Sequence, residues 1–206
     1  MVVGVLLLAG CGGTAQKPPP DPGRQVLGGF LRAAARGDEE AMRRLLSPQS
    51  SKRLSAARLR SLAHRLAPAA KRYLLVVSER ITDSFGVAAV LWRSSSYGAA
   101  LRRVGHGWRL ELDGPVHVRA LGPDPGARER QVRQIAAAVS GATGKGYALM
   151  WLDGLTLPTR TARLGTNLTM FANLPSRVVR GRHSVVVFAS EGNQASALAW
   201  TFTVPR

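Results

Sequence analysis

The chain has almost no cysteine, since Cys11 is the only one among its 206 residues. A single thiol excludes a disulfide within the chain and a zinc site built from several cysteines. Stability must therefore come from packed hydrophobic cores, and hydrophobic residues make up 45% of the sequence. The roughly 190 residues after the N-terminal segment are enough for two small domains of about 100 residues each.

Groups that could converge on a catalytic centre are also scarce. The four histidines, His64, His106, His117 and His183, are far apart, and none has the His-x-His or His-x-x-x-His spacing that binds a metal from one face. The Ser-x-x-Lys and Gly-x-Ser-x-Gly patterns of serine nucleophiles are absent as well. We therefore expect no metal, no cofactor and no enzymatic activity.

Acidic residues are few: 12 against 29 basic ones, for a net charge of +17. The excess is spread along the chain, with +10 over residues 24–113 and +7 over residues 114–206. No run of Lys or Arg exceeds two, and no aromatic-interleaved RNA-binding motif accompanies them, so a specific nucleic-acid partner is not expected. The charge is either a solvated arginine-rich surface or an attraction to anionic lipid headgroups or wall polymers.

A long apolar run is missing too, because the apolar N-terminus covers only residues 1–10, whereas a transmembrane helix needs about 20. Leu8-Ala9-Gly10-Cys11 closes this run and resembles the lipobox of bacterial lipoprotein signals. The resemblance implies that residues 1–11 are a signal peptide whose Cys11 carries a lipid. No Lys or Arg precedes Lys17, so we expect the start codon upstream. The alternative is a buried thiol in an N-terminal strand.

Residues 12–24 are rich in Pro and Gly and predict an extended spacer. Three helices are expected next. Leu27, Phe30, Leu31 and Ala34 share one helical face before Gly37. Asp38 can cap a second helix that ends at Ser47-Pro48, and a third starts near Ser50 and ends before Pro68.

After Pro68 the hydrophobic period changes to two. The expected strands, separated by turn residues at hairpin spacing, are residues 71–78, 85–92, 97–104 and 107–113. In the last run Trp108, Leu110 and Leu112 alternate with charged residues, which predicts an antiparallel meander with one covered face. Helices segregated from such a sheet make an α+β domain.

This order, with helix–Gly37-Asp38–helix and a meander closing on Gly107-Trp108-Arg109-Leu110, resembles the NTF2-like, cystatin-related α+β cone over residues 25–113. The resemblance implies a curved sheet wrapped on a long helix around a cone that sometimes holds a ligand. Phe30, His64, Tyr73, Trp92 and Trp108 are candidate lining residues of that cone. The competing interpretation is that the aromatic residues are simply core.

From Gly114 onward only strand signals recur. The expected strands are residues 116–121, 132–139, 147–152, 166–171, 183–189 and 197–204; helical spacing also fits residues 132–139, but strand is preferred. Asp153-Gly154 and the ending around Gly192-Asn193 resemble the hairpins of bacterial Ig-like domains. The resemblance implies an all-β Ig-like sandwich over residues 114–206 that serves as a spacer or binding scaffold.

Together these features predict a non-enzymatic binding or scaffold lipoprotein of the cell envelope, anchored by Cys11 to the extracytoplasmic face of the cell membrane. Its expected partner is an envelope protein or an anionic wall polymer. Two alternatives stay open. One is a small-molecule binder or enzyme that uses the cone, and the other is a protein attached to the wall by charge alone.

Overall fold

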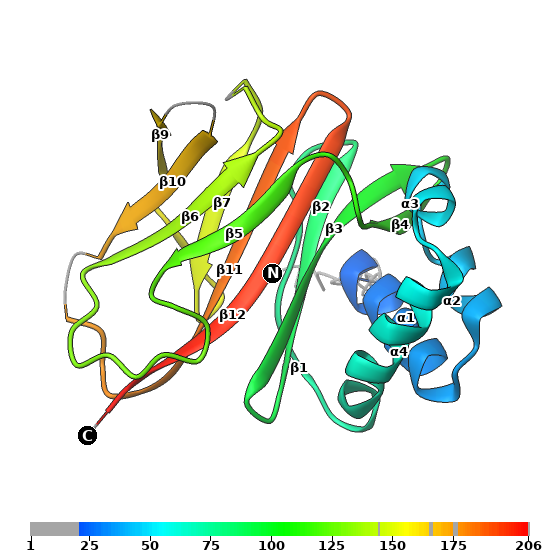
Figure 1. Ribbon diagram of the computed structural model, residues 1–206, viewed down its shortest axis with the longest axis horizontal. Coiled ribbons are helices and arrows are strands. Elements are labelled where there is room, and N and C mark those ends of the chain that lie inside the picture. The colour runs from blue at the N-terminus through cyan, green and yellow to red at the C-terminus, as the bar shows by residue number, and fades with distance from the viewer. Residues whose placement is uncertain (1–20, 144, 165–166, 175–176, 206) are drawn as a thin grey trace, which may run out of the picture.

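A computed structural model describes residues 21–143, 145–164, 167–174 and 177–205. The lipobox-like segment with Cys11 and most of the expected spacer lie outside these residues. The described residues form four α-helices and twelve strands, and the strands make three antiparallel four-stranded sheets. The expectation of N-terminal helices followed by antiparallel strands is confirmed at this level (Figure 1).

The helices come first in the chain, and polar caps set their ends. They are α1 (Pro22–Arg36), α2 (Glu39–Arg44), α3 (Pro48–Arg53), α4 (Ala56–Leu66) and a 3-10 turn, η1 (Ala67–Lys71). Asp21 caps α1, which therefore begins inside the segment expected as spacer, and a left-handed Gly37 ends it. The third predicted helix is two helices, because the side chain of Ser55 caps a new one just after Leu54.

The first sheet is the predicted meander, in the order β1-β2-β3-β4. Its strands are β1 (Leu74–Arg80), β2 (Phe85–Trp92), β3 (Ser95–Val104) and β4 (Gly107–Glu111). The turn between β2 and β3 is tighter than expected: Ser95 already pairs with Trp92, and Arg93 takes a positive φ of 49°.

The remaining strands form two further sheets. One has the order β5 (His117–Gly122), β6 (Gln134–Ser140), β10 (Asn167–Asn173), β9 (Arg160–Leu164). The other has the order β12 (Gln194–Val204), β11 (Gly181–Glu191), β7 (Ala148–Leu152), β8 (Leu155–Leu157). The preference for a strand at residues 132–139 is confirmed. The short strands β8 and β9 were not predicted, since each has at most five residues and no clear alternation.

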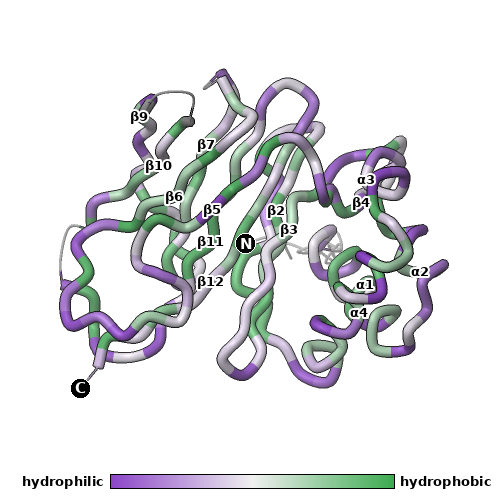
Figure 2. The backbone as a smooth tube through the Cα atoms, in the orientation of Figure 1, coloured by the Kyte–Doolittle hydropathy of each residue, from purple (hydrophilic) through white to green (hydrophobic). Residues whose placement is uncertain are grey.

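The molecule is a stack of four layers in which the helices cover one end (Figure 1). Beside them come, in order, the β1–β4 sheet, the β12-β11-β7-β8 sheet and the β5-β6-β10-β9 sheet, with a hydrophobic cluster between each pair of neighbouring layers. Figure 2 shows the apolar strands inside the stack. In β2, Val90 faces the helices while Val87 and Ala89 face the next sheet. The expectation of one covered face for the meander is therefore wrong, because a second sheet covers its other face.

Candidate functional site

The five residues predicted to line a cone are not gathered around one cavity. Phe30 is fully buried in the cluster between helices and sheet. His64 is exposed on α4. Tyr73 and Trp92 line a cleft beside η1, and Trp92 also borders a groove between α4, β3 and β12. Trp108 lines a separate hollow near the start of α1.

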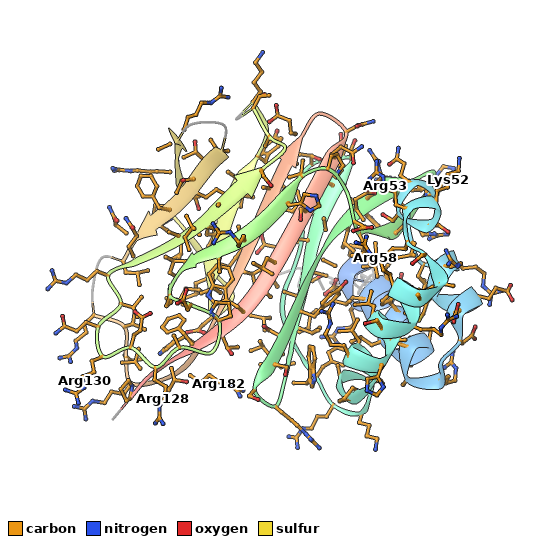
Figure 3. The ribbon with its side chains drawn as sticks, in the orientation of Figure 1. Lys52, Arg53, Arg58, Arg128, Arg130 and Arg182 are labelled. Atoms are coloured by element: carbon orange, nitrogen blue, oxygen red, sulfur yellow. The ribbon has the colours of Figure 1, made fainter. Side chains whose placement is uncertain are left out.

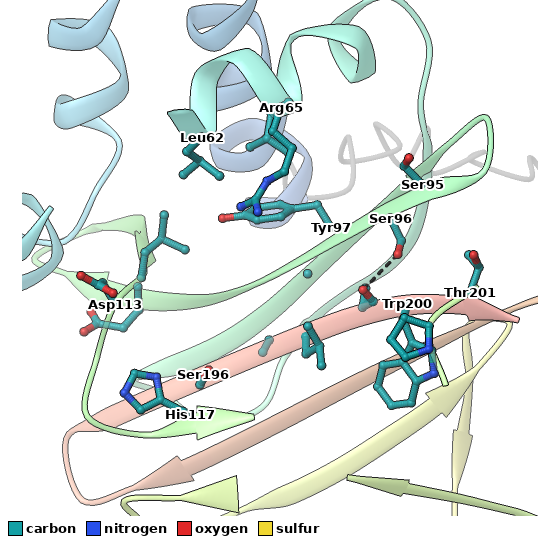
Figure 4. Close-up of a pocket in the computed structure, with 18 of the residues that line it drawn as sticks. Leu62, Arg65, Ser95, Ser96, Tyr97, Asp113, His117, Ser196, Trp200 and Thr201 are labelled. Atoms are coloured by element: carbon teal, nitrogen blue, oxygen red, sulfur yellow. Dashed lines mark hydrogen bonds between the residues drawn. The ribbon is translucent and has the colours of Figure 1, made fainter. Parts of the chain in front are cut away.

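The hollow that joins several layers is instead a groove of about 620 Å³ between α4, β3 and β12. Figure 4 shows Leu62, Arg65 and Tyr97 on one side of it and Ser196 and His117 on the other. Its walls come from both halves of the sequence, so no single local motif marks it.

The groove exists because β3 is longer than its neighbour β4. The last pair of that ladder joins Ala100 to Glu111, so residues 95–99 of β3 have β2 on one edge and no described strand on the other. The backbone of Leu110 bonds away from β3, to Leu45 and Ser47. Its partner Leu101 therefore turns its backbone groups toward β2, and the next residue, Ala100, turns them toward β4. Because peptide groups alternate along an antiparallel strand, Ser96 and Gly98 turn theirs to the same side as Ala100, which is the open edge.

The opposite wall is also the open edge of a strand. β12 is at the edge of its sheet, and its Thr201 and Thr203 bond outward to the backbone of residues 126–129. By the same alternation, Ala195 and Ala197 turn their peptide groups outward, and both residues line the groove. The two strands approach closely at Gly98, where an added Cβ would lie 2.9 Å from the backbone nitrogen of Ala199.

Two polar side chains, Tyr97 of β3 and Arg65 of α4, lie on the side of the groove that is next to the helices. Burial raises the pKa of the Tyr97 hydroxyl above its ordinary value, and the nearby Arg65 guanidinium opposes this by a smaller amount. The hydroxyl therefore stays neutral and can donate a hydrogen bond. Arg65 adds a positive charge beside it (Figure 4) and forms no ion pair within the described part of the chain.

A buried carboxylate lies at the other end of the groove. The Glu111 side chain is completely buried, and within the described ranges neither of its oxygens has a hydrogen-bond partner. Its counter-charge is Arg102, whose Nη1 lies 3.7 Å from Oε2. Arg102 also donates to Gln49 and to the carbonyl of Asn193, so it ties α3, β3 and the β11–β12 turn together.

The groove thus offers strand edges, apolar side chains, a phenol and a guanidinium. Among the described residues no three of the His, Cys, Asp and Glu side chains are grouped as a metal site. No helix in the described ranges is both long and apolar enough to cross a membrane. No protein-family model matches the sequence, and no curated protein matches it.

Proposed function

We propose that this protein is a non-enzymatic, membrane-anchored lipoprotein of the cell envelope that binds an extended segment of a partner protein in the groove. The single observation that supports this binding mode is the open edge of β3 at residues 95–99. An extended peptide adds to such an edge through main-chain hydrogen bonds, while pockets select alternate side chains.

The groove could serve both needs of an added strand. Ser96 and Gly98 offer backbone groups where β4 has ended, so a peptide of about five residues would continue the sheet along this edge. Leu62 of α4 would contact side chains on one face of that peptide, and β12 would lie along the other. Arg65 would favour an acidic residue in the segment.

The finer fold assignment belongs to the same proposal. The α1–α4 helices with β1–β4 form an NTF2-like unit, and β5–β12 form an Ig-like sandwich. The strand orders support the second half: β5-β6-β10-β9 and β12-β11-β7-β8 correspond to the orders A-B-E-D and G-F-C-C′ of immunoglobulin sheets. One departure is Trp151 on β7, which packs toward the β1–β4 sheet and not into the sandwich.

A proline at Ser96 tests the strand-addition mode. Proline has no N–H and is tolerated at a strand edge, so Ser96→Pro removes a donor from the open edge. The control is Ser96→Ala, which also loses the 3.0 Å bond from Oγ to the carbonyl of Ala199 but keeps the N–H. A photocrosslinker at Ser95 in intact cells should link wild type and Ser96→Ala to one short partner segment, and Ser96→Pro should lose that link. Equal links from both variants would contradict strand addition.

The anchor is tested separately through Cys11. In detergent phase separation, Cys11→Ser should move the protein from the detergent phase to the aqueous phase. Unchanged partitioning would contradict lipidation and leave the groove proposal standing, because the crosslinking comparison does not depend on the thiol.

A small-molecule ligand is the second candidate function, and the size of the groove favours it. A volume of about 620 Å³ lies within the range of about 300–1000 Å³ that is usual for ligand pockets. This alternative predicts that a metabolite or lipid panel contains a compound that raises the melting temperature of the whole protein. It also predicts that Ser96→Pro and Ser96→Ala respond equally to that compound.

A further inference from the structure

A second cleft, beside η1, differs from the groove in its charge. It has a volume of about 1150 Å³, and its lining includes four cations, Lys71, Arg72, Arg93 and Arg182, and no acidic residue. None of the four forms an ion pair within the described ranges. Unpaired cations that share one hollow attract an anionic group strongly.

The fold holds these cations together from distant parts of the sequence. Lys71 ends η1, Arg72 precedes β1, Arg93 forms the β2–β3 turn, and Arg182 is the second residue of β11. The Arg182 guanidinium donates to the carbonyl of Arg93, so the β11 end is fixed against the turn. Their positive charges therefore converge through the layer packing.

Positive charge continues along the same end of the molecule. Arg182 and Arg128 flank Thr203 in neighbouring backbone pairs, so they form one row across β12. Figure 3 shows Arg128, Arg130 and Arg182 at this end, whereas Lys52, Arg53 and Arg58 lie at another. There, Arg58 pairs with Asp113 at 2.7 Å. Arg128, Arg130 and Arg182 form no ion pair within the described ranges.

An aliphatic side chain projects among these cations. Leu74 lines the cleft and is 64% exposed. Cations that flank exposed aliphatic residues suit a bilayer surface, where charge meets headgroups and the aliphatic groups enter the acyl boundary.

We propose that this end, defined by Lys71, Arg72, Leu74, Arg93 and Arg182, binds the surface of an anionic phospholipid bilayer. The phosphate headgroups lie against the four cations, and Leu74 enters the interface. This contact is independent of the thiol at Cys11 and orients the protein on the membrane with the β2–β3 turn toward the lipid.

The test uses the full chain carrying Cys11→Ser, so that no lipid anchor contributes, and vesicles of phosphatidylcholine with or without phosphatidylglycerol. Co-sedimentation should occur with the anionic vesicles and fall steeply with added salt. Lys71→Gln with Arg72→Gln should lower the partition coefficient about 25-fold, since each cation near the surface contributes about a fivefold factor. Leu74→Ser should give a smaller loss.

The matched control is Lys52→Gln with Arg103→Gln, which removes the same charge from exposed positions away from the cleft. This variant should keep most of the binding. An equal loss in both double variants would show a response to net charge alone and overturn the proposal. Equal binding to phosphatidylcholine vesicles, or tighter binding to a single-stranded oligonucleotide at the same phosphate concentration, would overturn it too.

Discussion

The two faces of the β1–β4 sheet are both covered, but by different means. On the helical face, large apolar side chains such as Phe30, Leu59 and Leu101 fill the space with no exposed surface. The other face meets the β12-β11-β7-β8 sheet through smaller residues, among them Ala89 and Ala100, packed around Trp151 and Phe188.

Hydrogen bonds between side chains and the opposite sheet surround this second core. Trp151 Nε1 donates to Glu79 at 3.1 Å, Ser96 Oγ to Ala199 at 3.0 Å, and Thr201 Oγ1 to Ser94 at 3.2 Å. An apolar centre with a polar rim is the anatomy of an interface between proteins. The junction between residues 21–113 and residues 114–205 is therefore built like an interface, and the groove opens at its rim.

The largest effect should come from breaking the ion pair at that rim. Arg102→Met leaves the fully buried carboxylate of Glu111 without a counter-charge, which should lower the free energy of unfolding by about 3 kcal/mol. Chemical denaturation followed by tryptophan fluorescence measures this. Adding Glu111→Leu to Arg102→Met should restore most of the loss, and a double variant as unstable as the single one would contradict the assigned role.

Two glycine substitutions, one on each side of the sheet, should change the stability in opposite directions, each by less than Arg102→Met. Gly98→Ala places a Cβ 2.9 Å from the backbone of β12, and this overpacking should cost about 2 kcal/mol. Gly29→Ala on α1 meets only a flexible Leu45 methyl group at 3.3 Å and should stabilise the helix by about 0.5 kcal/mol. Thermal unfolding of both variants measures the difference, and shifts of the same sign would contradict it.

The helices and the meander could be predicted because their signals are local. Leu27, Phe30 and Leu31 show the helical period, and capping residues such as Asp38 lie beside the ends they cap. The groove could not be predicted, because it depends on β3 running past the end of β4 and on β12 arriving about a hundred residues later. Gly98 inside a strand was the one local signal of that close approach.

The candidate lining residues are dispersed over the fold for a related reason. In a small domain, aromatic residues have the same spacing in the sequence whether they belong to the core or line a cavity. Phe30 belongs to the core. Tyr73 and Trp92 do meet at one cleft. The cations that make this cleft positively charged come from separate segments of the chain. The even spread of charge along the sequence gave no sign that they would meet.

The smallest expected effect concerns Tyr97, whose hydroxyl lies between the helical face and the groove. Burial raises its pKa in the folded protein, so its contribution to stability is fully present below the unfolded phenol value of about 10 and is lost as the pH rises above it. Tyr97→Phe should therefore lose less stability than wild type between about pH 10 and about pH 12. Urea unfolding across this range measures the difference, with Tyr147→Phe, at an exposed position, as the control that should follow wild type. Parallel curves for wild type and Tyr97→Phe would show that the phenol is solvated and that the groove is open to water at this wall.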